Sequence, residues 1–268
     1  MKIDWKQQTI VLTGAYGGFG QALAEELSHL GACLILIGRN ETKLKALQAK
    51  LKSPTDTLVG DVSESETIEK LLSILLHKQS SQHMLINNAG LSNAGFLQQQ
   101  PTAQIKHMVD VNLLAPMLMT QQLLPWLKQA TQAQIINVGS SFGGIGYPGF
   151  SGYCATKFGL RGFTQAINRE LADTQVKAFY LAPRAMSTGI NSSKVDELNQ
   201  KLGNAVDEPQ VIAKQFIKSI EKNQTEKFFG WPEKLFVRIN ALFPKVVSKA
   251  IKKDQATIQT LLNNEVKS

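Results

Sequence analysis

The chain has 268 residues, and its 29 Lys and Arg against 21 Asp and Glu give a formal net charge of +8. This length suits one large α/β domain or two small ones. The composition, 43% hydrophobic and 19% charged, is globular and excludes long disorder, collagen-like repeats and a disulfide scaffold. Two cysteines favour a reducing compartment. Without a signal-peptide core or an apolar run of roughly 18–20 residues, we expect a cytoplasmic protein.

Short apolar, β-branched runs alternate along the chain with longer segments of helical periodicity. Strands are expected at Thr9–Thr13, Cys33–Ile37, Thr57–Val59, Met84–Ile86, Gln134–Val138 and Val176–Leu181, with Lys227–Gly230 as a seventh. Helices are expected at Gln21–Leu30, Glu41–Leu51, Ser65–His77, Thr102–Leu127, Gly152–Ala172 and Pro209–Lys222. This alternation predicts an α/β fold, a doubly wound and mostly parallel sheet with helices on both faces.

No internal repeat or linker divides the chain. Residues 1–231 are expected to form a single domain, and 232–268 to add extra C-terminal helices packed on it. Within the domain, residues 184–207 are polar and weakly periodic, which is typical of a lid above the carboxyl edge of the sheet.

A glycine-rich turn, Thr13-Gly14-Ala15-Tyr16-Gly17-Gly18-Phe19-Gly20, follows the first strand and opens the first helix. Glycine lets the backbone turn sharply and approach a diphosphate, while the helix N-terminus offers unpaired N–H groups to the anion. The turn therefore indicates a nucleotide site.

The spacing of this turn, Thr-Gly-x-x-x-Gly-x-Gly, resembles that of the short-chain dehydrogenase/reductase family. Four further elements occur in that family's order: Asp61 after the third strand, Asn87-Asn88-Ala89-Gly90 ending the fourth, Asn112 in the next helix, and Ser140 thirteen positions before Tyr153-Cys154-Ala155-Thr156-Lys157. The resemblance covers most of the first 190 residues. It implies a Rossmann-type fold that uses NAD(P) to oxidise or reduce a carbonyl or alcohol carbon.

The end of the second strand bears on the choice of cofactor. An NAD-binding member would carry Asp or Glu there, whereas this chain has Gly38 and Arg39. A guanidinium pairs with a 2′-phosphate that a carboxylate would repel, so we expect NADPH rather than NADH. The alternative, in which Arg39 caps the strand or pairs with Glu41, leaves Gly38 without a reason.

The resemblance also implies a set of cofactor contacts. Asp61 corresponds to an adenine-contacting residue, although it could equally cap the next helix. Thr188 corresponds to a carboxamide contact, but Arg184 stands where the family usually has glycine, and this departure affects the local backbone. The full set comprises Thr13, Gly14, Tyr16, Gly18, Phe19, Gly20, Arg39, Asp61, Val62, Asn88, Ala89, Gly90, Tyr153, Lys157, Pro183 and Thr188. Asn87 is expected to pack there too.

Tyr153 and Lys157 lie four residues apart and share one face of a helix. A free phenol has a pKa of about 10. The nearby ammonium and the positive end of the helix are expected to lower that pKa, so that Tyr153 acts as general acid and base. Ser140 would donate a hydrogen bond to the same substrate oxygen. By resemblance, Lys157 also holds the ribose hydroxyls of the cofactor.

Asn112 can be argued from its neighbours. Asn is a weak helix former, and Pro116 four residues later has no N–H for the Asn112 carbonyl. We expect a freed carbonyl and a kink there. In the family the matching Asn helps bind a water that relays protons to the lysine. A plain proline kink is the alternative.

No metal site is expected, because His29, His77, His83 and His107 lack paired ligand spacing. Cys154 should point away from the Tyr153 face as a small packed side chain.

The substrate is only loosely indicated. Apolar side chains of the lid and strand-end loops favour an apolar carbonyl or alcohol compound: Leu91, Phe142, Tyr147, Phe150, Met186 and Ile190. The expected function is thus an NADPH-dependent oxidoreductase. A non-catalytic nucleotide-sensing or membrane-surface scaffold of the same fold is the alternative.

Partners are suggested by the tail and by the resemblance. Basic residues after Trp231 alternate with apolar ones, which describes either a solvated helix face or a peripheral contact with a membrane. The tail aromatics Phe228, Phe229, Trp231, Phe236 and Phe243 could be core, pocket cover, subunit contact or membrane contact. No nucleic-acid module is visible. By resemblance, Thr102–Leu127 and Gly152–Ala172 would form a homodimer or homotetramer.

Overall fold

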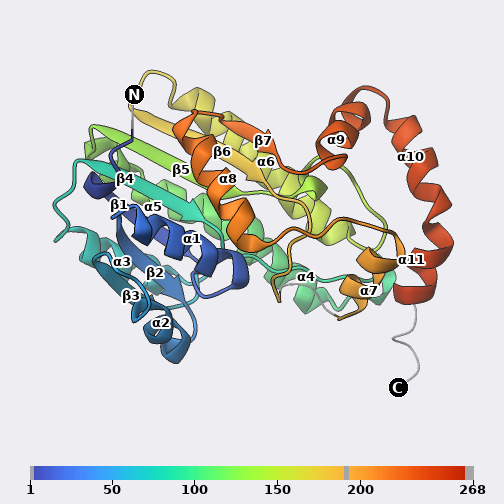
Figure 1. Ribbon diagram of the computed structural model, residues 1–268, viewed down its shortest axis with the longest axis horizontal. Coiled ribbons are helices and arrows are strands. Elements are labelled where there is room, and N and C mark those ends of the chain that lie inside the picture. Colours follow the sequence, from blue (N-terminus) through green and yellow to red (C-terminus); the bar gives the residue numbers. More distant parts are fainter. Residues whose placement is uncertain (1–2, 190–192, 263–268) are drawn as a thin grey trace.

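The computed structural model describes residues 3–189 and 193–262, and these build a layered α/β structure around one sheet (Figure 1). The strands are β1 (Gln8–Thr13), β2 (Cys33–Gly38), β3 (Thr55–Val59), β4 (Gln82–Asn87), β5 (Gln132–Val138), β6 (Val176–Ala182) and β7 (Glu226–Phe228). Their order is β3-β2-β1-β4-β5-β6-β7, and every neighbouring pair is parallel. The doubly wound sheet expected from the sequence is confirmed.

The central strands are apolar on both faces because helices cover both. Val11 is in register with Ile35 on one side and Leu85 on the other, and all three are buried. This register aligns the carboxyl ends of β1, β2 and β4 at one edge. The chain changes winding direction between β1 and β4, which is where such sheets bind ligands.

Helices α1 (Gly18–His29), α2 (Glu41–Gln48) and α8 (Pro209–Glu221) contribute to one core layer. Figure 1 shows α1 and α8 side by side in front of the sheet. Phe19 and Phe216 meet edge to face between them, and Phe229 stacks on Phe216. Helices α3 (Ser65–Leu75), α5 (Ala115–Gln129) and α6 (Ser151–Glu170) cover the other face.

The single helix expected at Thr102–Leu127 is wrong in detail. The structure has α4 (Thr102–Val109), a π-helical turn (Asp110–Leu114) and then α5. The amide of Ala115 bonds to the Asp110 carbonyl, five residues back. Because Pro116 has no N–H, the regular ladder is broken at this point, and the widened turn accommodates the break.

The lid contains a helix that its weak periodicity did not predict, α7 (Ser193–Lys201). Val195 and Leu198 of α7 are buried against α11 (Gln255–Leu262). Between them in the chain lie α9 (Glu233–Leu242) and α10 (Pro244–Lys253). Ile190, expected in the lid, lies outside the described residues. In residues 3–189 and 193–262, none of the helices combines the length and apolarity needed to cross a bilayer.

Candidate active site

The glycine-rich turn packs so closely that side chains at Gly14 and Gly20 would not fit. Gly14 has φ +63°, and a Cβ there would lie 2.8 Å from Ala89 Cα. A Cβ on Gly20 would overlap the Gly14 carbonyl. The backbone therefore passes directly into the N-terminus of α1, whose first N–H groups have no partners within the helix. A diphosphate fits this cradle, because it can approach the bare backbone and accept these bonds.

Polar side chains fasten the turn to the end of β4. Thr13 Oγ1 accepts from the amides of Asn88 (2.9 Å) and Ala89 (3.0 Å). Asn88 Nδ2 donates to the carbonyls of Thr13 (3.0 Å) and Gly14 (3.1 Å). Thr13, Asn88 and Ala89 thus meet as the sequence predicted, and they set the shape of the turn.

Three residues expected at the cofactor have side chains in the core. Phe19 and Val62 are buried in the two core layers, so any contact with a cofactor would be made by their backbones. Asn87 points into the core, where its Nδ2 donates to Asn137 Oδ1 (2.8 Å), and Asn137 Nδ2 donates to Thr164 Oγ1 (2.8 Å). Asn87 therefore joins β4, β5 and α6 rather than facing a ligand.

The structure at the end of β2 gives Gly38 a reason that does not involve Arg39, contrary to the argument made from the sequence. A Cβ on Gly38 would lie 2.5 Å from the Tyr16 ring, so Gly38 is explained by the packing of Tyr16. Arg39 remains 60% exposed and pairs with Asp61 at 3.6 Å, not with Glu41, which pairs with Lys45.

Lys43, which the sequence did not single out, places a second cation at this end of β2. Its Nζ lies 5.6 Å from the Tyr16 ring centroid. The signal available was its position four residues after Arg39, in the first turn of the helix that follows β2.

Asp61 is held in a turn and does not cap α3. Its Oδ1 accepts from the amide (3.0 Å) and the hydroxyl (2.7 Å) of Ser63, while the N-cap position belongs to Glu64. Burial alone would raise the pKa of Asp61, but the Ser63 hydrogen bonds and the Arg39 charge lower it overall.

Ser140, Tyr153 and Lys157 come together at the end of β5 and the start of α6. The Ser140 side chain adjoins the Tyr153 phenol and lowers its pKa. Lys157 Nζ lies 5.7 Å from the Tyr153 ring centroid and donates to the Val138 carbonyl at 3.0 Å. The predicted face of Tyr153 and Lys157 is thus present, with Ser140 opposite it.

The expected lowering of the tyrosine pKa is wrong for the protein by itself. Burial raises the pKa of Tyr153 to about 12, and the Ser140 hydrogen bond offsets only part of this. The ammonium that was expected to stabilise a phenolate is itself buried: the Lys157 side chain is 5% exposed, and desolvation lowers its pKa to about 8. Loss of water is thus the largest cause of the pKa shift of each group.

Asn112 has both ends of its side chain occupied. Its Oδ1 accepts from the Leu91 amide at 2.7 Å, and its Nδ2 donates to the Leu91 carbonyl (2.8 Å) and to Thr156 Oγ1 (3.2 Å). A Cβ on Gly90 would meet Asn112 Oδ1 at 3.5 Å and Lys157 Nζ at 3.7 Å. Asn112 therefore clamps the loop after β4 beside Lys157, at the π-helical turn, so it is not idle beside a plain proline kink.

A buried tyrosine that sequence reasoning missed holds this site from beneath. Tyr180, on β6, has its hydroxyl 3.3 Å from the Ser140 amide, which donates to it, and 3.3 Å from the carbonyls of both Ser140 and Lys157. Its ring fills the space that side chains at Gly139 and Gly143 would need. The signal in the sequence was an unusually glycine-rich loop, Gly139-Ser140-Ser141-Phe142-Gly143-Gly144, opposite a tyrosine in a buried strand.

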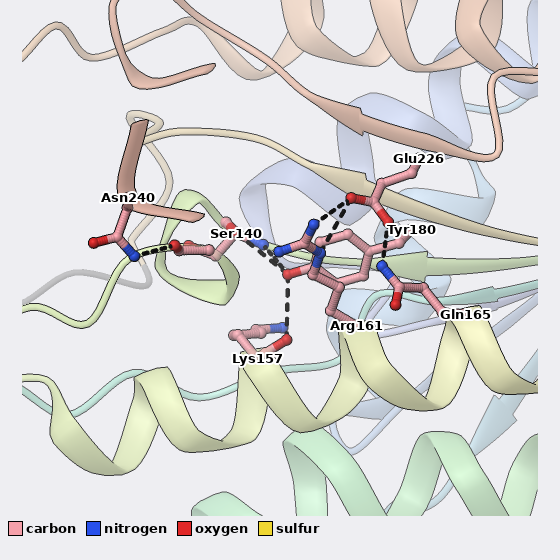
Figure 2. Close-up of polar contacts among 8 residues, drawn as sticks. Ser140, Lys157, Arg161, Gln165, Tyr180, Glu226 and Asn240 are labelled. Carbon is pink, nitrogen blue, oxygen red and sulfur yellow. Dashed lines mark hydrogen bonds and ion pairs between the residues drawn. The ribbon is translucent and has the colours of Figure 1, made fainter. Parts of the chain in front are cut away.

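Figure 2 shows Tyr180 between Ser140 and an ion pair on the outer side of the sheet. Arg161 Nη2 of α6 pairs with Glu226 Oε1 at 2.6 Å, and Gln165 donates to the other oxygen of that carboxylate at 2.7 Å. On the opposite side of the picture, Asn240 of α9 donates to the Gly144 carbonyl at 3.0 Å. The loop that carries Ser140 is therefore fixed from α6, β6 and the C-terminal helices together.

An aromatic cluster adjoins Tyr153. Phe142 stacks on Tyr147 and packs against Phe150 and Tyr153, with ring centroids 5.1, 5.1 and 6.3 Å apart. Helices α7 and α11 pack onto this cluster, while Leu91 and Met186 lie in the two core layers instead. Cys154 is buried, and burial raises the pKa of its thiol, as a packed side chain requires.

Arg184, the departure from the family pattern, fastens the lid to the C-terminal helices. Its guanidinium makes two 2.8 Å bonds to the Asp207 carboxylate and further bonds to the Trp231 carbonyl (2.9 Å) and Glu233 (3.2 Å). Thr188 still reaches the start of α1, since a Cβ on Gly18 would lie 2.9 Å from its Cβ. Pro183 accepts from the Ser141 amide at 3.2 Å. Thr188 therefore lies at the glycine-rich turn although arginine replaces the usual glycine at position 184.

In the described part of the chain, no group of three or more His, Cys, Asp or Glu residues could hold a metal ion.

Comparisons with known proteins place this geometry among related enzymes. The profile of the short chain dehydrogenase family matches residues 8–199. A 3-oxoacyl-[acyl-carrier-protein] reductase FabG of Rickettsia typhi is 32% identical over 204 residues, 76% of this chain and 81% of that protein. An uncharacterized oxidoreductase of Staphylococcus epidermidis is 31% identical over 183 residues, 68% of this chain and 80% of that protein.

Two solved structures share the fold. A short-chain dehydrogenase/reductase of Burkholderia phymatum in complex with NAD has a TM-score of 0.82 at 21% identity, covering 91% of this chain and 96% of that one. A short-chain dehydrogenase of Sphingobium yanoikuyae in complex with NADPH has a TM-score of 0.75 at 24% identity, covering 92% of this chain and 96% of that one.

The buried ammonium makes stability depend on pH. The pKa of Lys157 is about 8 in the folded chain and near its ordinary value of 10.5 when unfolded, so between these values the unfolded chain binds more protons. We therefore compare the free energy of unfolding of the wild type with that of Lys157→Met. The wild-type value minus the variant value should rise by about 2 kcal/mol from pH 8 to pH 10. Urea titrations at each pH measure it, with the exposed Lys50→Met as baseline. A difference that does not change with pH would contradict the buried charge.

Proposed function

Since the chain belongs to the short-chain dehydrogenase/reductase family, we propose that it is an NADPH-dependent reductase of an apolar carbonyl compound. The observation that carries this proposal is the grouping of Tyr153, Ser140 and Lys157 at the carboxyl edge of the sheet, beside the glycine-rich turn. When bound, the nicotinamide supplies the hydride to the carbonyl carbon.

Tyr153 supplies the proton that completes the alcohol. With a pKa of about 12 in the free protein, its phenol is protonated at neutral pH and can give its proton to the oxygen as negative charge develops there. Ser140 donates a hydrogen bond to that oxygen and stabilises the same charge. The raised pKa therefore keeps the phenol in the protonated form that reduction uses near pH 7.

Lys157 and Asn112 assist Tyr153: Lys157 offers N–H groups to the cofactor and to water, and Asn112 positions the loop beside it. An ammonium has three N–H groups, and in the described residues Lys157 uses one of them on Val138. The others are available for the ribose hydroxyls and for a water on the way to solvent. Asn112 fixes the loop beside this ammonium and serves as a positioning residue for that proton path.

The cofactor preference rests on the end of β2. Arg39 and Lys43 are two cations on the segment that leaves this strand, where a 2′-phosphate would lie. Asp61 pairs with Arg39 and orients its guanidinium. The remaining contacts proposed for the cofactor are the backbone of the glycine-rich turn, Tyr16, Asn88, Ala89, Gly90, Pro183 and Thr188.

The substrate class follows from the surroundings of Tyr153. Phe142, Tyr147 and Phe150 form an apolar wall beside the phenol, covered by α7 and α11. Such a wall favours a chain of apolar groups on the carbonyl compound. The likeness to 3-oxoacyl-[acyl-carrier-protein] reductases supports a ketoacyl group as the carbonyl.

A homodimer is proposed from the surface of the central helices. Val109, Leu114, Met117, Leu118 and Phe158 are each 38–44% exposed on α4, α5, α6 and the turn between α4 and α5. These apolar side chains are those that a second copy would cover.

The mechanism predicts the effect of removing the phenol oxygen. Tyr153→Phe should lower NADPH-dependent turnover of a 3-ketoacyl thioester at least about 1,000-fold, since the proton donor is lost. NADPH binding, followed by its fluorescence, should change little. Turnover within tenfold of the wild type would refute the role of Tyr153 and favour a nucleotide-sensing scaffold.

The cofactor proposal predicts a change of preference. Arg39→Ala should weaken NADPH binding about tenfold or more and leave NADH binding within twofold, because only NADPH carries the 2′-phosphate. The matched control is Lys45→Ala, which removes an exposed lysine of α2, the helix that follows Arg39, where Lys45 pairs with Glu41. Equal losses for both cofactors, measured by fluorescence titration, would contradict the 2′-phosphate contact.

A further inference from the structure

The segment 231–253, called here the C-terminal hairpin, comprises Trp231-Pro232, α9 and α10. Figure 1 shows α10 along the outer edge of the molecule, beyond the lid and α11. Only a narrow face of the hairpin is buried: Val237 and Val247 pack with Ile145, and Asn240 holds the Gly144 carbonyl. The rest of its surface faces away from the domain.

Large apolar side chains occupy that outward surface. Leu242 is 74% exposed, Phe243 63%, Trp231 62% and Val246 59%. Leu235 and Leu242 lie seven residues apart on α9 and so share one face, which is not the face that buries Val237. A tryptophan, a phenylalanine and two aliphatic side chains are thus exposed within 16 residues, and we call them the apolar patch of the hairpin. Large apolar side chains exposed this close together in the chain are typical of a surface that binds a partner.

The charges around this patch have one sign. The hairpin carries six basic residues, Lys234, Arg238, Lys245, Lys249, Lys252 and Lys253, against one acidic residue, Glu233. Glu233 pairs with Arg184, which Asp207 also contacts. Among the described residues, none of the six pairs with a carboxylate. The hairpin thus holds most of the net positive charge of the chain.

Exposed apolar side chains surrounded by basic residues could bind either a second copy of the chain or an anionic lipid surface, and the charges favour the lipid. If a second copy docked hairpin to hairpin, it would bring the same basic residues opposite each other, which charge repulsion opposes. An anionic lipid surface complements both features, because acyl chains accept the apolar side chains and phosphates accept the ammonium groups. A tryptophan such as Trp231, with an apolar ring and a polar N–H, favours the boundary between the two regions.

We propose that the C-terminal hairpin binds the surface of an anionic lipid bilayer, with Trp231, Leu242, Phe243 and Val246 inserted at the headgroup boundary and the basic residues at the phosphates. The same segment is tied to the active site: Arg184 links Trp231 and Glu233 to the lid, and α10 leads into α11 beside the aromatic cluster. Bound in this way, the protein presents its lid and α11 near the bilayer. The binding itself does not depend on the proposed enzymatic function.

Co-sedimentation of the full chain with vesicles tests this proposal. We expect at least tenfold tighter binding to vesicles of phosphatidylcholine with 30% phosphatidylglycerol than to pure phosphatidylcholine, weakening as salt rises from about 50 to 300 mM. Lys245→Glu with Lys249→Glu should lower binding at least about tenfold, and Leu242→Ser with Phe243→Ser by a similar factor.

Matched controls lie outside the hairpin. Leu76→Ser removes an 84% exposed leucine from the end of α3, and Lys50→Glu with Lys52→Glu reverses two exposed lysines; both should bind as the wild type does. Equal binding of the wild type to both vesicle types would overturn the proposal, as would hairpin variants that bind normally. Light scattering could instead show a wild-type dimer that becomes a monomer in the hairpin variants. If the wild type also failed to bind vesicles, the surface would belong to a second copy of the chain.

Discussion

A lysine ammonium buried at the carboxyl edge of a parallel sheet is the constraint around which this site is arranged. Burying a charge is costly unless polar atoms replace the lost water. Here the Val138 carbonyl accepts one bond from Lys157, and Asn112 keeps the loop after β4 close beside it. The incomplete replacement is what lowers the pKa of the ammonium, and the same dry surroundings keep the Tyr153 phenol protonated.

Contacts between distant segments hold the backbone around the buried lysine in place. Tyr180 occupies the volume left by two glycines and bonds the backbones of both Ser140 and Lys157, so β6 sets the distance between β5 and α6. Arg184 does the same on the lid side. Its bidentate ion pair with Asp207 joins the two ends of the lid, and its bonds to the Trp231 carbonyl and to Glu233 join the lid to the C-terminal helices. The loop of Ser140 is thus held by Tyr180, and the two ends of the lid by Arg184.

The sequence predicted the sheet, the helices that cover it and the residues that meet at its edge, because these follow from periodicity and from motifs whose spacing is local. It failed where packing between distant segments decides. Gly38 is explained by the Tyr16 ring, and Glu41 pairs with Lys45 while Arg39 turns to Asp61. The pKa of Tyr153 was predicted in the wrong direction because charge is visible in a sequence and burial is not. Helix α7 has little periodicity of its own and gains its apolar contacts from α11, more than 50 residues later.

The central claim is that one phenol, kept neutral by burial, holds the proton for the reaction. An absorbance titration at 295 nm of the unliganded wild type, with Tyr153→Phe subtracted, tests this claim most directly. The account predicts no phenolate signal from Tyr153 up to pH 10.5, in keeping with a pKa of about 12. A subtracted signal with a midpoint below pH 9 would show that the lysine charge, and not desolvation, controls this residue.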